Sequence, residues 1–276
     1  MVASPAGSSR AEGSRSNELE MNDVLAVEDV EIRYGAGEAA FTAVAGIDLQ
    51  IPEHRTTVII GPSGCGKSSL LLGMAGFILP TKGRFAMDGE AIRGPSPERM
   101  VVFQDFEQLF PWFSVQRNLE YALKVTRGLD RQRAVTVARE SLAMVGMLAA
   151  AHKHPHELSG GMKQRTAIAR ALSLESRILL MDEPFGALDA ITRSQLQVEL
   201  KAIVTRTKVT VVFITHSISE AIFLGDQVVC MAANPGRVVD TMDVAAIHEL
   251  SGPQFDAASD RLRGSLQAGT SQEHKE

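Results

Sequence analysis

The chain has 276 residues, 45% of them hydrophobic, which is enough for one large domain or two modest ones with a sizeable core. Its formal net charge of −5 leaves no basic excess for wrapping nucleic acid, which counts against proteins that bind DNA or ribosomes. The two cysteines, Cys65 and Cys230, are too few for a disulfide framework and favour a reducing cytosol. The longest apolar stretch, Leu70 to Leu79, is about half of what a bilayer requires.

The first part of the chain reads as a disordered tail followed by short strands. Residues 1–22 are rich in Ser, Gly, Ala and charged residues and lack the apolar core of a signal peptide. From Val24 to Gln104, β-rich runs alternate with turns, and one helix is expected from Gly66 to about Phe77. The expected strands are Leu25–Tyr34, Phe41–Ile51, Thr56–Ile60, Gly83–Met87 and Met100–Phe103.

The apolar period then becomes helical, as at Val135, Ala138, Leu142 and Val145, which recur at three- and four-residue steps. We therefore expect a helical subdomain at about 106–170, inserted into the sheet-forming sequence. Strands return afterwards, with one helix from about Ala190 to Thr205 between the first two. These strands are Ser176–Met181, Val209–Thr215 and Gln227–Met231.

Such nearly continuous apolar strands predict a parallel sheet covered by helices on both faces, and hence an α/β fold. On this pattern residues 23–243 form the main domain. Residues 244–276 form a C-terminal extension that we expect to be partly disordered, because it is polar from about Gln267.

The segment from Gly61 to Ser68 has two glycines with four residues between them, followed by lysine and a hydroxyl residue. Backbone N–H groups can surround phosphate oxygens where no Cβ blocks them, and the glycines provide these places. Lys67 adds positive charge at the outer phosphates, Ser68 can ligate Mg²⁺, and the following helix directs its positive end at the anion. The residues expected to bind a nucleoside triphosphate are Gly61, Pro62, Ser63, Gly64, Cys65, Gly66, Lys67, Ser68 and Ser69.

Two carboxylates follow the apolar run from Ile178 to Met181. An α/β sheet places its ligands at the carboxyl ends of its strands, so these groups are expected beside the phosphate loop. Asp182 is then the Mg²⁺ carboxylate, directly or through water. Glu183 points the other way and can polarise the attacking water as general base.

A second helix start can also bind an anion. Ser159, Gly160 and Gly161 open a helix with exposed N–H donors and a hydroxyl, and one nucleotide does not need two such ends. With Gln164 and Arg165 following, the chain here resembles the ABC-transporter ATPase family. In that family this segment of one subunit caps the ATP that is held by the phosphate loop of the other.

The resemblance covers about residues 24–235 and implies further roles. Tyr34 matches the aromatic residue on which adenine stacks, and Gln104 matches the glutamine that reaches Mg²⁺ and water. His216 matches the histidine at the γ-phosphate, and Asp189 lies in the loop through which two subunits sense each other. The implied fold is a P-loop NTPase (RecA-like) core with a parallel sheet, an antiparallel β subdomain and the inserted α-helical subdomain.

Two departures from the family pattern are mild, because neither removes a catalytic group. Ser69 stands where threonine is commoner, and Glu157 stands where glutamine often precedes Leu158. Nearby, three histidines alternate with other residues and could form a metal cluster together with Glu157, although Pro155 favours a surface connector. The histidines are His152, His154 and His156.

An aromatic run from Phe106 to Phe113 is open to two interpretations. It is either a loop that faces the core or a groove for a helix of a partner. The resemblance implies the second, with the coupling helix of a membrane subunit contacting Phe110, Pro111 and Trp112. The sequence from Leu109 to Trp112, followed by Val115 and Asn118, also resembles that of the nitrate, sulfonate and taurine import branch.

The resemblance implies a peripheral ATPase at the cytoplasmic face of the membrane, working as a head-to-tail homodimer with ATP and Mg²⁺. Its partners are membrane-spanning permease subunits and, indirectly, a solute-binding protein outside the membrane; nucleic acid is not expected as a partner. The expected catalytic residues are Glu183, His216, Lys67 and Gln104, and the expected Mg²⁺ ligands are Ser68, Gln104 and Asp182.

Two alternatives remain open on the sequence. One is a soluble ABC ATPase acting on nucleic acid or ribosomes, although such chains usually carry two cassettes or long coiled-coil insertions. The other is a regulatory subunit without useful turnover, which the presence of Lys67, Asp182, Glu183 and His216 disfavours.

Overall fold

A computed structural model describes residues 22–104, 108–247 and 249–271. Residues 1–21 of the expected tail, residues 106 and 107 of the aromatic run and residues 272–276 of the C-terminal extension lie outside the described residues. Within the described part of the chain, none of the helices combines the length and the apolar character needed to cross a membrane.

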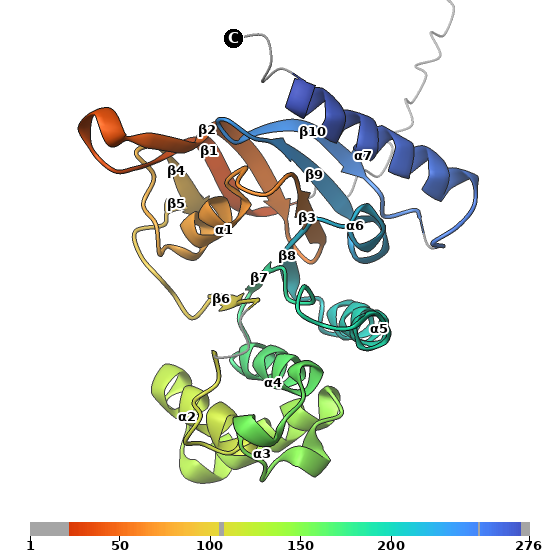
Figure 1. Cartoon of the computed structure of the whole chain (residues 1–276). Coiled ribbons are helices and arrows are strands. Elements are labelled where there is room, and N and C mark those ends of the chain that lie inside the picture. Colours follow the sequence, from red (N-terminus) through yellow and green to blue (C-terminus); the bar gives the residue numbers. More distant parts are fainter. Residues whose placement is uncertain (1–21, 105–107, 248, 272–276) are drawn as a thin grey trace, which may run out of the picture.

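Two sheets form the framework of the molecule (Figure 1). The smaller is antiparallel in the order β2-β1-β4-β5, with β1 (Asp23–Tyr34), β2 (Phe41–Pro52), β4 (Lys82–Met87) and β5 (Glu90–Ala91). A short 3-10 turn, η1 (Gly37–Ala39), joins its first two strands. This sheet is the antiparallel subdomain that the sequence analysis expects.

The larger sheet has the order β10-β9-β3-β8-β7-β6. Its strands are β3 (Thr56–Ile60), β6 (Arg99–Val102), β7 (Ile178–Asp182), β8 (Thr210–Thr215), β9 (Gln227–Ala232) and β10 (Arg237–Asp243). All its neighbours pair in parallel except β10, which pairs antiparallel with β9 at the edge. The predicted parallel sheet is therefore confirmed.

Both faces of the larger sheet are buried, and the side chains of its central strands alternate between two cores. Val58 and Ile60 of β3 face one core, whereas Ile59 between them faces the other. Helix α1 (Lys67–Ala75) packs between the two sheets, and α4 (Gly160–Ser173), α5 (Ala190–Thr207) and α6 (Ile218–Leu224) cover the opposite face. Because side chains alternate along a strand, a run of apolar residues supplies both cores at once.

The helical insert leaves the sheet after β6 and returns at β7, which are neighbouring strands at its edge. It contains α2 (Val115–Arg127), α3 (Arg131–Met144) and α4, with short 3-10 turns η3 (Leu148–Ala150) and η4 (Pro155–Glu157). Ser114 and Asp130 cap the first two helices by accepting hydrogen bonds from backbone N–H groups. Figure 1 shows the three helices gathered below the sheets.

The C-terminal extension contains a helix that was not predicted from the sequence. This helix, α7 (Pro253–Ser271), packs on α6, β9 and β10. Ala258 and Leu262 are buried on its inner face, so contact with the domain stabilises a helix whose sequence is largely polar. The strand β10 and the short helix α6 were likewise not predicted from the sequence.

Candidate active site

The phosphate loop joins β3 to α1, in the strand, loop, helix order that the sequence predicts. Gly66 is the residue before the helix and has a left-handed backbone, with φ of 88°. A Cβ on Gly66 would lie 2.5 Å from Cγ1 of Val44, and one on Gly61 would lie 2.6 Å from the Met231 carbonyl oxygen. Glycine is therefore required at both positions by conformation or close packing. Pro62, Ser63 and Gly64 lie at the surface of the loop, while Cys65 is buried.

Lys67 is the first residue of α1, and its side chain turns back along the loop. Its Nζ donates to the carbonyl oxygens of Gly61 and Pro62, at 2.9 Å each, and lies 3.8 Å from Sγ of Cys65. Burial raises the pKa of the Cys65 thiol, and Lys67 partly opposes this shift. The positive charge of Lys67 is thus held inside the curve of the loop, where the sequence analysis expects the outer phosphates.

Tyr34 and Ser69 come together on one side of the loop. The Tyr34 hydroxyl donates to Oγ of Ser69 at 3.0 Å, and the tyrosine side chain is exposed at the end of β1. An exposed aromatic ring at this place is compatible with stacking on a base, which stays a prediction.

Asp182 ends β7 beside the start of α1, at the same edge of the sheet as the loop. Burial raises the pKa of Asp182, and a hydrogen bond from the Ser68 hydroxyl and the charge of Lys67 act in the opposite direction. The contact between Ser68 and Asp182 brings together a hydroxyl and a carboxylate, which are the oxygen donors that Mg²⁺ prefers. The structure places these two predicted ligands next to each other.

Glu183 follows Asp182 in a strained backbone conformation, with φ of 42°, and its N–H donates to the Ile214 carbonyl of β8. Its Oε2 lies 3.2 Å from Nδ1 of His216, at the end of β8. Strain of this kind is held by surrounding structure and gathers at functional sites. The two side chains that the sequence predicts around the attacking water therefore meet across neighbouring strands.

Gln104 and Asp189 are two further residues that the sequence predicts for the site. A Cβ on Gly186 would come within 2.8 Å of Nε2 of Gln104, so the glutamine lies against the segment that follows Glu183. Asp189 caps α5 by accepting from the N–H groups of Ile191 and Thr192, at 3.1 Å each. These bonds lower the pKa of Asp189, led by the one from Thr192, so the carboxylate stays charged at the exposed helix start.

The helix start that the sequence predicts as a second anion site, at Ser159, Gly160 and Gly161, lies away from the phosphate loop. Ser159 caps α4 by accepting from the N–H of Met162 at 3.4 Å, and Gly161 packs so closely on α5 that a Cβ would lie 2.6 Å from Cγ2 of Thr192. Both line a hollow of about 350 Å³ together with residues of the helical insert. In Figure 1, α4 lies with α2 and α3 at the helical end of the molecule, whereas α1 lies among the strands. The candidate site of one chain is thus divided into two separate halves.

The aromatic run forms a cluster that is partly exposed. The ring of Phe110 lies 5.3 Å from Tyr121 and 5.6 Å from Trp112, and Trp112 is 68% exposed. Asn118 is buried beneath it, accepting from the Phe110 N–H at 2.8 Å and donating to the carbonyl oxygens of Phe110, Phe113 and Ser114. The loop is therefore fixed by the core on one side and presents aromatic surface on the other.

Glu157 and the neighbouring histidines form a cap of a short turn. Oε2 of Glu157 accepts from the N–H of His154 at 2.6 Å, and this bond lowers the pKa of Glu157. The rings of His154 and His156 stack with centroids 5.8 Å apart. Within the described residues, no group of three or more potential metal ligands is found.

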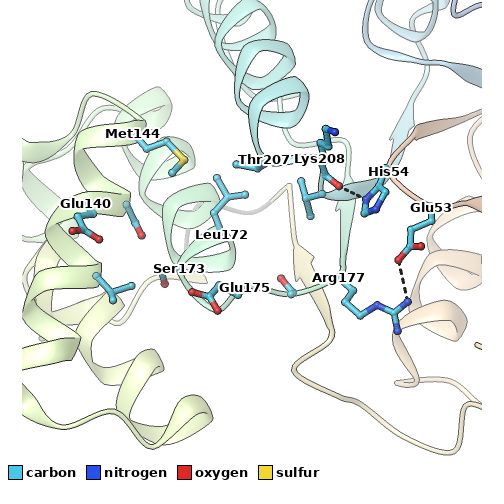
Figure 2. Close-up of a pocket in the computed structure, with 14 residues that line it drawn as sticks. Glu53, His54, Glu140, Met144, Leu172, Ser173, Glu175, Arg177, Thr207 and Lys208 are labelled. Carbon is cyan, nitrogen blue, oxygen red and sulfur yellow. Dashed lines mark hydrogen bonds and ion pairs between the residues drawn. The ribbon is translucent and has the colours of Figure 1, made fainter.

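A pocket of about 450 Å³ opens at the other end of the strands (Figure 2). Glu53, His54 and Arg177 border it on the sheet side, and Glu140 and Met144 of α3 border it on the helical side. Because Arg177 precedes β7 whereas Asp182 ends it, this pocket lies at the amino ends of the strands. The predicted chemistry lies at their carboxyl ends.

Sequence reasoning missed three polar residues around His216. Thr215, Glu220 and Gln197 form a buried chain of hydrogen bonds, and two of them line the same narrow hollow as Glu183 and His216. A signal was present, because Glu220 is a charged residue within the apolar segment 218–224.

Comparison with known proteins identifies the family of the chain. A profile of the ABC transporter family, described as "ABC transporter", matches residues 44–186. The chain is 47% identical over 196 residues to the nitrate import ATP-binding protein NrtC of Synechocystis sp., covering 71% of this chain and 29% of that protein. It is 44% identical over 221 residues to the taurine import ATP-binding protein TauB of Pseudomonas entomophila, covering 80% of this chain and 84% of the relative.

The chain spans only about a third of the length of NrtC and of the bicarbonate transport protein CmpC of Synechococcus elongatus. Among solved structures, a dimeric ATP-binding cassette in a post-hydrolysis state with ADP and Pi has a TM-score of 0.69 and 29% identity, covering 80% of this chain and 98% of that one. The expected fold and the expected resemblance to the nitrate and taurine branch are thus confirmed. This chain belongs to the ABC transporter family.

Proposed function

We propose that this chain hydrolyses ATP to power a membrane importer of a small solute. The observation that carries the proposal is the convergence, at one sheet edge, of the phosphate loop, the Ser68 and Asp182 pair and the Glu183 and His216 pair. Each group has a distinct task in phosphoryl transfer, and a nucleotide-binding module without turnover would not need the last pair.

Mg²⁺ fits the residues at this edge. Ser68 and Asp182 supply a hydroxyl and a carboxylate oxygen in contact with each other, and Gln104 adds an amide oxygen near the Glu183 segment. The ion, when bound, neutralises charge on the β- and γ-phosphates. Because its pKa is raised by burial, Asp182 gains from a cation that stabilises the charged form.

Hydrolysis follows from the positions of the remaining groups. The loop N–H groups and Lys67 hold the phosphates, and Lys67 exchanges its bonds with Gly61 and Pro62 for phosphate oxygens. Glu183 orients the attacking water and accepts its proton. His216, which contacts Glu183 at 3.2 Å, holds the carboxylate in line and reaches the γ-phosphate.

We also propose a head-to-tail homodimer. Ser159 and Gly161 stand apart from the phosphate loop of the same chain, so they complete a site only by facing the loop of a second copy. The solved dimeric cassette supports this assembly.

The relatives named for nitrate, taurine and bicarbonate support a small anionic or sulfonate-like solute. The exposed cluster at Phe110, Pro111 and Trp112 supports a permease contact at the cytoplasmic face of the membrane.

Substitution of the proposed base tests the reaction. Glu183→Gln keeps the shape of the side chain but cannot accept the proton, so we expect phosphate release to fall by about 10² or more while an ATP-bound dimer accumulates on size-exclusion chromatography. Glu140→Gln makes the same chemical change on exposed α3 and serves as the control. Normal steady-state turnover in Glu183→Gln would contradict the role of Glu183.

A further inference from the structure

His216 stands in a two-residue turn, where its backbone lies outside regular strand and helix bonding. β8 ends at Thr215 and α6 begins at Ile218, so His216 and Ser217 alone connect them. The His216 side chain is 66% exposed, yet it must keep its 3.2 Å contact with Glu183. A side chain with so little packing depends on a fixed backbone for its position, because small displacements of a reacting group slow a reaction strongly.

Hydrogen bonds beneath the turn provide such a fixed backbone. The Thr215 hydroxyl accepts from the Ser217 N–H at 3.0 Å and donates to Oε2 of Glu220. The hydroxyl of Ser217 in turn accepts from the Glu220 N–H at 3.3 Å. The residues on both sides of His216 are therefore bonded to each other and to Glu220.

Glu220 also connects the turn to a second helix. Its Oε1 accepts from Nε2 of Gln197, in α5, at 2.6 Å. Glu220 is 9% exposed, and Thr215 is 2% exposed. A buried carboxylate is costly unless donors satisfy its oxygens, and both oxygens of Glu220 have one. The network is therefore complete, and removing any member leaves a buried polar atom without its partner.

We infer that Glu220 is a positioning residue for hydrolysis, acting on His216 through the bond of its carboxylate to Thr215, whose hydroxyl also holds the Ser217 N–H at the end of the turn. Gln197 connects this support to α5, the helix that Asp189 caps. The inference rests on the proposed function and adds to it the means by which His216 is held against Glu183. Glu220 itself acts through its neighbours rather than by touching the nucleotide.

Exchanging the amide and the carboxylate between positions 197 and 220 tests this role. Gln197→Glu alone places two carboxylates at a 2.6 Å contact, so they repel and the turn shifts. Glu220→Gln alone is milder, because the Gln197 amide can turn over and accept. The double variant, Gln197→Glu with Glu220→Gln, restores one carboxylate and one amide in the opposite order and should recover the network.

The full chain is assayed for phosphate release with MgATP. We expect Gln197→Glu to lower kcat about tenfold with little change in KM or in ATP affinity, and the double variant to recover most of the loss. Gln195→Glu, which adds the same charge at an exposed position of α5, is the control and should behave as the wild type. NMR shifts of the His216 ring should move in Gln197→Glu and return in the double variant.

Several outcomes would overturn the inference. An unchanged kcat in Gln197→Glu would do so, as would a loss of kcat that the double variant fails to recover. A further loss of kcat when Gln197→Glu is added to His216→Ala would also overturn it, because the substitution would then act on something other than His216. A loss of ATP affinity in step with a lower melting temperature would indicate a purely structural role. A wild-type chain that releases no phosphate would overturn the proposed function and this inference with it.

Discussion

At the scale of single residues, backbone conformation decides what the phosphate loop and the site require. Gly66 combines a left-handed backbone with close contact to β2, while Glu183 holds a left-handed conformation that a glutamate rarely adopts. Position 66 therefore favours glycine for two separate physical reasons, its backbone conformation and its close packing. The conformation of Glu183 is the kind of local strain that a functional position retains because the side chain is needed there.

The two reasons at Gly66 can be measured separately by comparing it with Gly89, which has φ of 80° but open space around its Cβ position. We expect Gly89→Ala to lower the free energy of unfolding by about 1–2 kcal/mol through backbone strain alone. Gly66→Ala should cost about 1–3 kcal/mol more, because its Cβ would also meet Val44 and the Ala43 carbonyl. Urea unfolding gives both values, and equal losses would show that packing at Gly66 is unimportant.

At the scale of elements, the helices differ in whether a side chain caps their first backbone N–H groups. Gly66 precedes α1 without a side-chain cap, whereas Asp189 uses its side chain to satisfy the start of α5. Ser114 and Ser159 cap α2 and α4 in the usual way. The aromatic loop before α2 is held in shape by Asn118.

We therefore expect Asn118→Ala to loosen that loop and to lower the free energy of unfolding by about 1–3 kcal/mol, because it leaves buried backbone groups of Phe110 and Phe113 unpaired. Trp112 is the single tryptophan of the chain, so its fluorescence anisotropy reports on this loop directly and should fall. Asn118→Asp keeps the acceptor for the Phe110 N–H but loses the donors, and should fall in between. Unchanged anisotropy in Asn118→Ala would exclude the role of Asn118 as the support of the loop.

At the scale of the whole molecule, the candidate site is divided between two ends of the structure. Lys67, Asp182 and Glu183 gather at the carboxyl edge of the parallel sheet, while Ser159 opens a helix in the insert. The insert leaves the sheet after the edge strand β6 and returns at the neighbouring strand β7, and α4 packs against the sheet. In a head-to-tail pair of chains, the phosphate-loop half of each chain faces the Ser159 half of the other, so two complete sites form.

Mixing two inactive variants tests this assembly. Lys67→Ala disables the phosphate-loop half and Ser159→Arg blocks the opposite half, so each alone should release little phosphate. In an equal mixture about half of the dimers contain both variants, and each of these has one intact site, so about a quarter of the wild-type activity should return. Mixing Lys67→Ala with Glu183→Gln, which lie in the same half, provides the control. Recovery in that control, or none in the first mixture, would contradict the head-to-tail arrangement.

Elements with local signals can be predicted from the amino-acid order alone. Strands buried on both faces are apolar throughout, the phosphate loop needs glycines at set spacings, and carboxylates that follow a strand lie at its end, so β3, β7, Lys67 and Asp182 could be predicted. Only the tertiary structure showed that α7 is ordered, because its largely polar sequence becomes helical by packing on α6, β9 and β10. It also revealed the bonds from Gln197 through Glu220 to Thr215, because these residues come from three different elements and no sequence spacing records a contact between side chains that folding alone brings together.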